Sequence, residues 1–216
     1  MIALFGGSFD PIHEGHAHVV ASLAEGAPWN KLYVMPTSQN PAKAEPPRAS
    51  AVHRRAMVEA SVAALPGVGI LDWELELPGP GFTVDTVARA LRELDPEVVL
   101  VLGADAWQGF TLWREPRKIL ENAHVLVVSR DGSEPPAAAS VLGAVGISGA
   151  TISGPRTVHS KSQRWIEIRR FPALPWSSSS VRESIARAWK QSPLVCPGGV
   201  QPAVWDIISR ERLYTA

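Results

Sequence analysis

The segment LFGGSFDPIHEGH places residue types suited to phosphate binding directly after the first apolar run of the chain. Gly6 and Gly7 have no side chain, so a phosphate can approach their backbone closely. Ser8 and Phe9 add backbone N–H groups, and successive N–H groups in a turn form a concavity that binds anions. The segment therefore predicts a site for a small anion at the end of a strand.

Two histidines follow this turn, His13 and His16, three residues apart. We expect them to share a face in the first turn of the next helix, where the helix dipole already favours an anion. A glycine turn followed by two surface histidines is the simpler interpretation. A zinc site is a third interpretation, because HEGH is followed by His18. The metalloprotease helix needs histidines four apart, however, and no second cluster completes a metal shell.

A second candidate anion site lies in the sequence PWSSSSVRESI. The serines from Ser177 to Ser180 lead into a helix whose first turn contains Arg182. Hydroxyl groups, N-terminal amides and a guanidinium together suit a phosphate, although the serines alone would also serve as an ordinary helix cap. Two anion sites on one chain suggest a polyphosphate that is held from both sides.

Two other nucleotide motifs are absent. GGSFDP lacks the GxGxxG spacing, and the second strand ends in Met35-Pro36-Thr37 rather than in an acidic residue, which argues against a nicotinamide-dependent dehydrogenase. The Walker sequence ending in Gly-Lys-Ser/Thr is also missing. P-loop phosphoryl transfer is therefore disfavoured.

The composition is that of an ordinary globular protein. The chain has 216 residues, 45% hydrophobic and 19% charged, and 21 basic residues balance 21 acidic ones. This balance favours neither a nucleic acid polymer nor an anionic membrane as partner. Cys196 is the only cysteine, and no run approaches the roughly 18 to 20 apolar residues of a membrane span. Met1 leads straight into a predicted strand with no charged region before it, so we expect no leader sequence. We expect a cytoplasmic protein, and the sequence is compatible with assembly into a homo-oligomer.

Strand-like and helix-like segments alternate along the chain, as in a parallel sheet with crossover helices. Ser50 and Thr83 are candidate helix caps. Residues 131–163 lack periodicity and read as surface loops with at most a weak strand near 145–152. The predicted strands are 1–5, 31–35, 68–73, 98–102, 124–129 and 164–171, and the predicted helices are 12–23, 51–65, 83–94, 116–122, 179–191 and 201–213.

These elements predict an α/β fold with a doubly wound, mostly parallel sheet and a small helical C-terminal subdomain. We place the boundary so that residues 1–172 form the nucleotide-binding core and residues 173–216 carry the SSSSVR motif. Ligands of such sheets bind beyond the carboxyl ends of the strands. GGSF, VLVLGAD and HVLVVSRD each end one strand, so their loops are expected to face one crevice.

These motifs resemble a known family. GGSFDPIHEGH is similar to the GxFDPxHxGH signature of nucleotidylyltransferases, and WSSSSVRESI to their second motif, (I)SSTxIR. The segments between them resemble bacterial nicotinate-nucleotide adenylyltransferases. Those segments are MPTSQNPAK, GFTVDT, LGADAW, TLWRE and the ending CPGGVQPAVWDIISRERLY. The likeness spans essentially the whole chain in the same order.

The resemblance implies a Rossmann-like nucleotidylyltransferase fold and the transfer of AMP from ATP to nicotinate mononucleotide, with pyrophosphate as the second product, in NAD biosynthesis. Mg²⁺ would arrive with ATP and be held by its oxygens and water, so no protein metal site is expected. A phosphate monoester is already a nucleophile, and positioning plus charge stabilisation would then suffice. This agrees with conspicuous residues that are hydrogen-bond donors.

The resemblance also assigns roles to residues. His13 and His16 would bind the triphosphate and stabilise charge at the α-phosphoryl group. Gly7, Ser8 and Phe9 would give backbone contacts to ATP, and Ser178, Ser179 and Arg182 would bind its β and γ phosphates. Gly103 and Asp105 would hold the adenosine, and Lys43 would reach the phosphates of either substrate. Thr83 and Trp113 would receive the nicotinate nucleotide, with the indole stacked on the pyridine ring.

The sequence departs from the family pattern at several positions. Ala42 stands where a histidine often precedes the loop lysine, Phe82 replaces a tyrosine, and Trp176 and Ser179 replace isoleucine and threonine. The segment 131–163 is longer than expected. The sequence is also compatible with transfer to another acceptor substrate, namely nicotinamide mononucleotide, phosphopantetheine or a cytidylyl acceptor. From another class, the chain could be a regulatory module that binds nucleotides without turnover, although His13, His16 and Arg182 argue against this.

Overall fold

The structure is a computed structural model that describes residues 1–25, 28–39, 45–77, 79–130, 134–172 and 174–215. Its strands are β1 (Ile2–Gly7), β2 (Lys31–Pro36), β3 (Val68–Ile70), β4 (Val98–Gly103), β5 (His124–Arg130), β6 (Ala150–Ser153), β7 (Arg156–His159) and β8 (Trp165–Phe171). Its helices are α1 (Glu14–Glu25), α2 (Ala51–Val62), α3 (Thr83–Glu93), α4 (Ala104–Gln108), the 3-10 helix η1 (Phe110–Leu112), α5 (Pro116–Asn122), α6 (Ala138–Ala144), α7 (Ser178–Ala188) and α8 (Pro202–Arg210).

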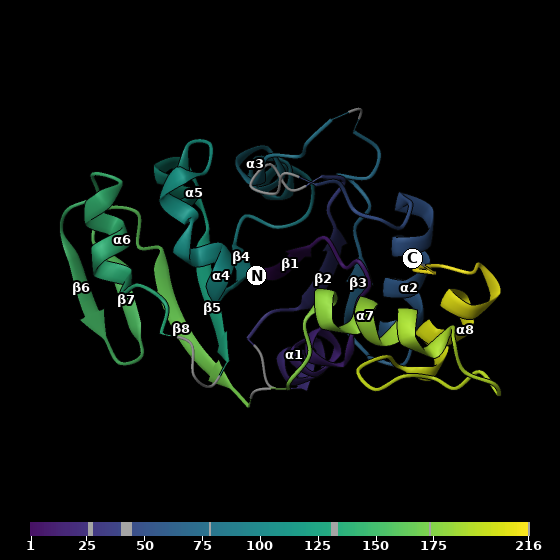
Figure 1. Ribbon diagram of the computed structural model, residues 1–216. Coiled ribbons are helices and arrows are strands. Elements are labelled where there is room, and N and C mark those ends of the chain that lie inside the picture. The colour runs from purple at the N-terminus through teal and green to yellow at the C-terminus, as the bar shows by residue number, and fades with distance from the viewer. Residues whose placement is uncertain (26–27, 40–44, 78, 131–133, 173, 216) are drawn as a thin grey trace. The chain divides into compact units, whose positions relative to one another are not determined.

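Among the described residues, the strands form one sheet in the order β3-β2-β1-β4-β5-β8-β7-β6 (Figure 1). β1 pairs with β4 in parallel, with Phe5 opposite Val101, and the parallel pairing continues from β4 to β5 and from β5 to β8. β7 joins β8 in antiparallel fashion, and β6 joins β7 likewise. The predicted fold class, a doubly wound and mostly parallel sheet with flanking helices, is confirmed.

The chain forms two compact units, and β1 and β2 run through both. Unit 1 comprises Met1–Phe5, Pro28–Leu32 and Phe82–Ala173, and unit 2 comprises Gly6–Ala27, Tyr33–Gly81 and Leu174–Ala216. Each unit is therefore built from three chain segments. The sequence-based boundary after residue 172 stays a prediction.

The core of unit 1 is built on β4 and β5 and fixes the segment between them. Trp107 and Phe110 are fully buried, and the Trp107 indole donates to the carbonyl oxygen of Pro136 at 2.9 Å. Partly buried Phe82 and Trp113 pack against this core. Burial of such large aromatic surfaces is strongly stabilising, so η1 and the adjoining loop are held in place.

Unit 2 carries both histidines and the serine-rich helix. α2 packs against α8 within this unit (Figure 1). On α7, Val181, Ile185 and Ala188 are buried. This i, i+4, i+7 spacing gives the helix one apolar face. Ser179 and Arg182 lie off that face, whereas Ser178 lies in line with Val181 and Ile185 at the start of the helix.

The structure corrects several expectations. Residues 150–159 form the hairpin of β6 and β7, and α6 precedes it, although the sequence predicted loops with at most a weak strand over 131–163. Thr83 is the first residue of α3, and Phe82 occupies the N-cap position. The strand β1 includes both glycines, and α1 begins only at Glu14, so His13 precedes the helix. None of the helices in the described residues has the length and apolar character needed to cross a membrane.

Candidate functional site

The turn after β1 is shaped by a close approach between two residues. A Cβ on Gly7 would lie 2.9 Å from the ring of Phe9, which is only 2% exposed and cannot move aside. Phe9 itself has a φ of 45°, a left-handed conformation that non-glycine residues rarely adopt and that is common at functional turns. The Gly7 carbonyl oxygen accepts from the Thr37 N–H at 2.9 Å. The turn is therefore rigid, and its second glycine is required by packing.

The two histidine rings lie against each other at the start of α1. Their centroids are 3.8 Å apart, and the Phe9 ring meets His16 edge-on at 5.0 Å. The His13 carbonyl oxygen accepts from the N–H groups of His16 and Ala17, so His13 ends the turn and begins the helical bonding. His13 is buried and His16 half-buried. The two imidazoles are thus paired at a helix N-terminus, although α1 begins at Glu14, two residues later than the predicted helix 12–23.

The four serines before Arg182 divide into two pairs. Ser177 and Ser180 form a capping box. The Ser180 N–H donates to the Ser177 hydroxyl at 3.1 Å, and the Ser177 N–H donates to the Ser180 hydroxyl at 3.0 Å. The Ser178 hydroxyl donates to the Pro11 carbonyl oxygen at 3.2 Å, and the Ser179 hydroxyl accepts from Arg182 at 3.1 Å. The cap therefore uses two serines, and the other two face the GGSFDPIHEGH segment and Arg182.

Arg182 joins the two motifs. Its Nη1 donates to the Asp10 carbonyl oxygen at 2.7 Å and lies 3.9 Å from the Asp10 carboxylate. The Asp10 carboxylate also accepts from the N–H groups of Arg48 and Ala49 and from the Tyr214 hydroxyl. Two stretches about 170 residues apart in the sequence therefore meet within unit 2, as a shared anion site requires.

Arg54 also holds the turn after β1 in place, although no sequence motif predicted this role. It is 2% exposed, and its Nη1 donates to the carbonyl oxygens of Ser8 at 2.7 Å and Thr37 at 2.6 Å. Burial lowers the pKa of this guanidinium, and Asp10 opposes that effect. The group keeps its charge, since arginine is not deprotonated in proteins. A basic residue within a predicted helix gave no signal for this role.

Four of the remaining predicted site residues, Gly103, Asp105, Thr83 and Trp113, lie in unit 1. Gly103 ends β4, and Asp105 is exposed in the first turn of α4. Thr83 begins α3, and the half-buried Trp113 ring lies 5.2 Å from Phe110. These residues are therefore held on the core of unit 1. Lys43, the last predicted contact, lies outside the described residues.

Comparison with known proteins then identifies the family. The sequence model of the cytidylyltransferase-like family matches residues 4–184. Proteins named as probable nicotinate-nucleotide adenylyltransferases from Rhodopirellula baltica and Pseudomonas paraeruginosa are 34% and 33% identical to this chain. The first alignment covers 86% of the chain and 82% of the relative, and the second covers 100% and 97%. This chain belongs to the nicotinate-nucleotide adenylyltransferase family.

Solved structures agree with this family at the level of the fold. A nicotinic acid mononucleotide adenylyltransferase from Plasmodium falciparum, complexed with APC, superimposes with a TM-score of 0.68 at 17% identity. The match covers 99% of this chain and 96% of that one. This likeness supports the fold, and the resemblance stated from the motifs is confirmed by the family model and the two named relatives.

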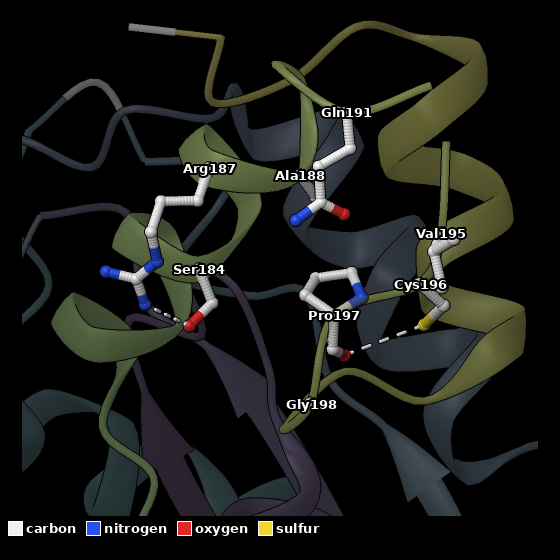
Figure 2. A pocket seen from close by; sticks show the side chains of 8 residues that line it. All are labelled: Ser184, Arg187, Ala188, Gln191, Val195, Cys196, Pro197 and Gly198. Atoms are coloured by element: carbon white, nitrogen blue, oxygen red, sulfur yellow. Dashed lines mark hydrogen bonds between the residues drawn. The ribbon is translucent and has the colours of Figure 1, made fainter. Parts of the chain in front are cut away.

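A surface pocket in unit 2 is separate from the predicted site residues. Figure 2 shows it between α7 and the segment that follows, where Arg187 donates to the Ser184 hydroxyl at 3.0 Å. Cys196 also lines it; burial raises the pKa of its thiol, and its sulfur donates to the Val200 carbonyl oxygen at 3.4 Å. None of the residues assigned to substrates lines this pocket. The bonds of Cys196 agree with a structural role.

Proposed function

We propose that this chain transfers the adenylyl group of ATP to nicotinate mononucleotide, which yields nicotinate adenine dinucleotide and pyrophosphate. One observation carries the proposal beyond family membership. Arg182 and Ser178 of the second motif bond directly to Asp10 and Pro11 of the first, at 2.7 and 3.2 Å. This brings donors from both motifs to one part of unit 2, where a triphosphate needs them.

The proposed reaction is an in-line displacement at the α-phosphorus. The phosphate oxygen of nicotinate mononucleotide forms a bond to this phosphorus, and the bond to the bridging oxygen of the β-phosphate breaks. Pyrophosphate leaves with the electron pair. No protein nucleophile takes part, so the chain contributes positioning and charge stabilisation.

Each group in unit 2 has a place in this proposal. His13 and His16 donate to the α-phosphoryl group, where negative charge is redistributed in the transition state. Gly7, Ser8 and Phe9 contribute backbone contacts. The Ser178 and Ser179 hydroxyls and the Arg182 guanidinium bind the β and γ phosphates and thereby stabilise the leaving pyrophosphate. Arg182 suits this role because its fork also bonds Asp10 and Ser179, which fixes its orientation.

The residues of unit 1 are proposed to hold the two nucleosides. Asp105 would accept from a ribose hydroxyl of adenosine beside Gly103. Trp113 would stack on the pyridine ring, with Thr83 beside it; its neighbour Phe110 supports the indole at 5.2 Å. Lys43 is proposed to reach the phosphates of either substrate.

Mg²⁺ is proposed to enter with ATP. The described residues contain no group of three or more His, Cys, Asp or Glu side chains that could hold a metal ion. The side chains proposed to bind the phosphates supply N–H and O–H donors, which suit phosphate oxygens rather than a metal ion. The triphosphate and water would supply the oxygen ligands that Mg²⁺ prefers, and the ion would offset phosphate charge.

The proposal is tested with purified protein, ATP, Mg²⁺ and one acceptor at a time. Nicotinate mononucleotide, nicotinamide mononucleotide and phosphopantetheine are compared, and CTP with a cytidylyl acceptor provides the fourth arm. We expect pyrophosphate release and the dinucleotide mass with nicotinate mononucleotide, at higher kcat/KM than with the amide. ATP binding without turnover in any arm would instead identify a regulatory module. Cytoplasmic location and the assembly state stay predictions, the latter measured by light scattering.

A further inference from the structure

The Asp10 carboxylate accepts hydrogen bonds from two separate parts of unit 2, the segment before α2 and the segment after α8. Its Oδ2 accepts from the Arg48 N–H at 2.8 Å, and its Oδ1 accepts from the Ala49 N–H at 3.0 Å and the Tyr214 hydroxyl at 2.7 Å. The residue is 6% exposed. A buried carboxylate depends on such donors, because losing one leaves its charge poorly compensated.

Tyr214 lies beyond α8 and donates to this carboxylate from 204 positions along the chain. It is 8% exposed and has a φ of 58°, so the backbone adopts an uncommon conformation where it delivers the hydroxyl. Burial and the neighbouring Asp10 charge raise the pKa of the phenol, which keeps it protonated as a donor. In the structure this hydroxyl acts as a hydrogen-bond donor to Asp10.

Asp10 in turn contacts the groups proposed to bind ATP. Its carbonyl oxygen accepts from Arg182 at 2.7 Å, and its carboxylate lies 3.9 Å from the same guanidinium. The next residue, Pro11, accepts from Ser178 at 3.2 Å. A displacement of Asp10 would therefore shift Arg182 and the turn that leads to His13.

We infer that Tyr214 is a positioning residue of the phosphate site, which acts through Asp10 to hold Arg182 in the orientation that binds the ATP phosphates. The inference rests on the proposed function. Nothing in the motif resemblance assigns this role to the hydroxyl. The simpler alternative is that Tyr214 only anchors the segment after α8.

A neighbouring residue provides the matched control. The Trp189 indole donates to the Leu213 carbonyl oxygen at 3.0 Å and so anchors the same segment without touching Asp10. Tyr214→Phe removes only the hydroxyl and keeps the ring, whereas Trp189→Phe removes the other anchor. The two variants separate anchoring from positioning.

The readouts are the ATP dissociation constant by calorimetry, kcat and KM for each substrate, and the melting temperature. We expect Tyr214→Phe to weaken ATP binding and raise the KM for ATP by about tenfold, the effect of losing one hydrogen bond to a charged group, with KM for the acceptor unchanged. We expect Trp189→Phe to lower the melting temperature with ATP binding within about twofold of wild type, as expected for a change away from the site. Equal ATP affinities in wild type and Tyr214→Phe overturn the inference.

A double-mutant cycle with Asp10→Asn tests the route of the effect. If Tyr214 acts through Asp10, adding Tyr214→Phe to Asp10→Asn changes the ATP dissociation constant by less than about twofold, because coupled residues are not additive. Fully additive effects overturn the inference. Since calorimetry needs no turnover, a wild-type protein that binds ATP but makes no dinucleotide would refute the proposed function while this inference is still decided by the binding data.

Discussion

The Arg182 guanidinium donates to the Asp10 carbonyl oxygen at 2.7 Å with one nitrogen and to the Ser179 hydroxyl at 3.1 Å with the other. This forked contact ties the serine-rich helix to the segment that contains both histidines. Because each arm of the fork is occupied by a protein group, the orientation of the planar guanidinium is fixed before substrate arrives. Such preorganisation reduces the entropy lost on binding a phosphate.

Arg182→Lys tests the fork. Lysine keeps the charge but has one nitrogen on a flexible stem, so it cannot make both contacts. We expect the KM for ATP to rise by about tenfold, in line with the loss of a charge-assisted hydrogen bond. Arg187→Lys on the same helix is the control, because Arg187 donates to Ser184 beside the surface pocket, which none of the residues assigned to substrates lines. A similar KM for wild type and Arg182→Lys would contradict the assigned role.

His16→Ala tests the role proposed at the α-phosphoryl group. We expect kcat to fall by about 100- to 1000-fold, the usual cost of removing one donor to a transition-state charge. The circular dichroism spectrum should be retained, since His16 is only half-buried. His18→Ala, two residues along α1, is the control and should keep nearly normal turnover. If both variants turn over equally, His16 has no catalytic role.

Trp113→Ala tests the stacking proposed for the pyridine ring. We expect the KM for nicotinate mononucleotide to rise by about tenfold, as for other base–aromatic stacks, with the ATP dissociation constant unchanged. Leu112→Ala is the control, because Leu112 is 88% exposed in the same loop. A rise in the KM of ATP alone would place the indole with the other substrate.

Much of the fold was predictable because burial leaves a strong sequence signal. β4 is a nearly continuous run of buried β-branched and leucine residues, and α5 spans the predicted residues 116–122 with Pro116 at its start. The hairpin of β6 and β7 was predicted only as a weak strand near 145–152, for the opposite reason. All four residues of β6 are exposed, so no apolar periodicity marks them. Pairing with β7, itself paired with β8, defines this strand.

The candidate site was predictable where its chemistry is local. The glycine turn, the histidine pair and the serines before Arg182 are each visible as a short motif. The bond from Tyr214 to Asp10 joins residues 204 positions apart, and no local spacing reveals it. The Arg54 contacts were missed for a related reason, since they go to backbone oxygens that every residue carries.

Gly7→Ala tests the close packing of the first turn. The added Cβ would meet the Phe9 ring at 2.9 Å, and Phe9 is too buried to yield. We expect the free energy of unfolding to fall by about 1–3 kcal/mol, the usual cost of overpacking. Gly109→Ala is the control, because nothing lies within 4 Å of the position that its added Cβ would take. Urea unfolding measures both; equal stabilities would mean that the turn adapts.

His124 predicts how stability depends on pH. It is 4% exposed and stacks on Trp165 at 4.7 Å, and its Nδ1 accepts from the Trp165 N–H at 3.1 Å. Burial, with Arg164 and Arg156 nearby, lowers its pKa from 6.5 to about 4. The unfolded chain therefore binds this proton first as the pH falls.

The sign of the effect follows from that order of protonation. The stabilising contribution of neutral His124 is complete above about pH 6.5 and is lost as the pH falls toward 4, where the folded form also binds the proton. We expect a loss of up to about 3 kcal/mol in the free energy of unfolding across this window. His124→Asn keeps an acceptor for the Trp165 N–H but does not titrate, so its pH profile should be flatter. Denaturant titrations at pH 7, 5.5 and 4 measure both profiles, and parallel curves would rule out His124 as the source.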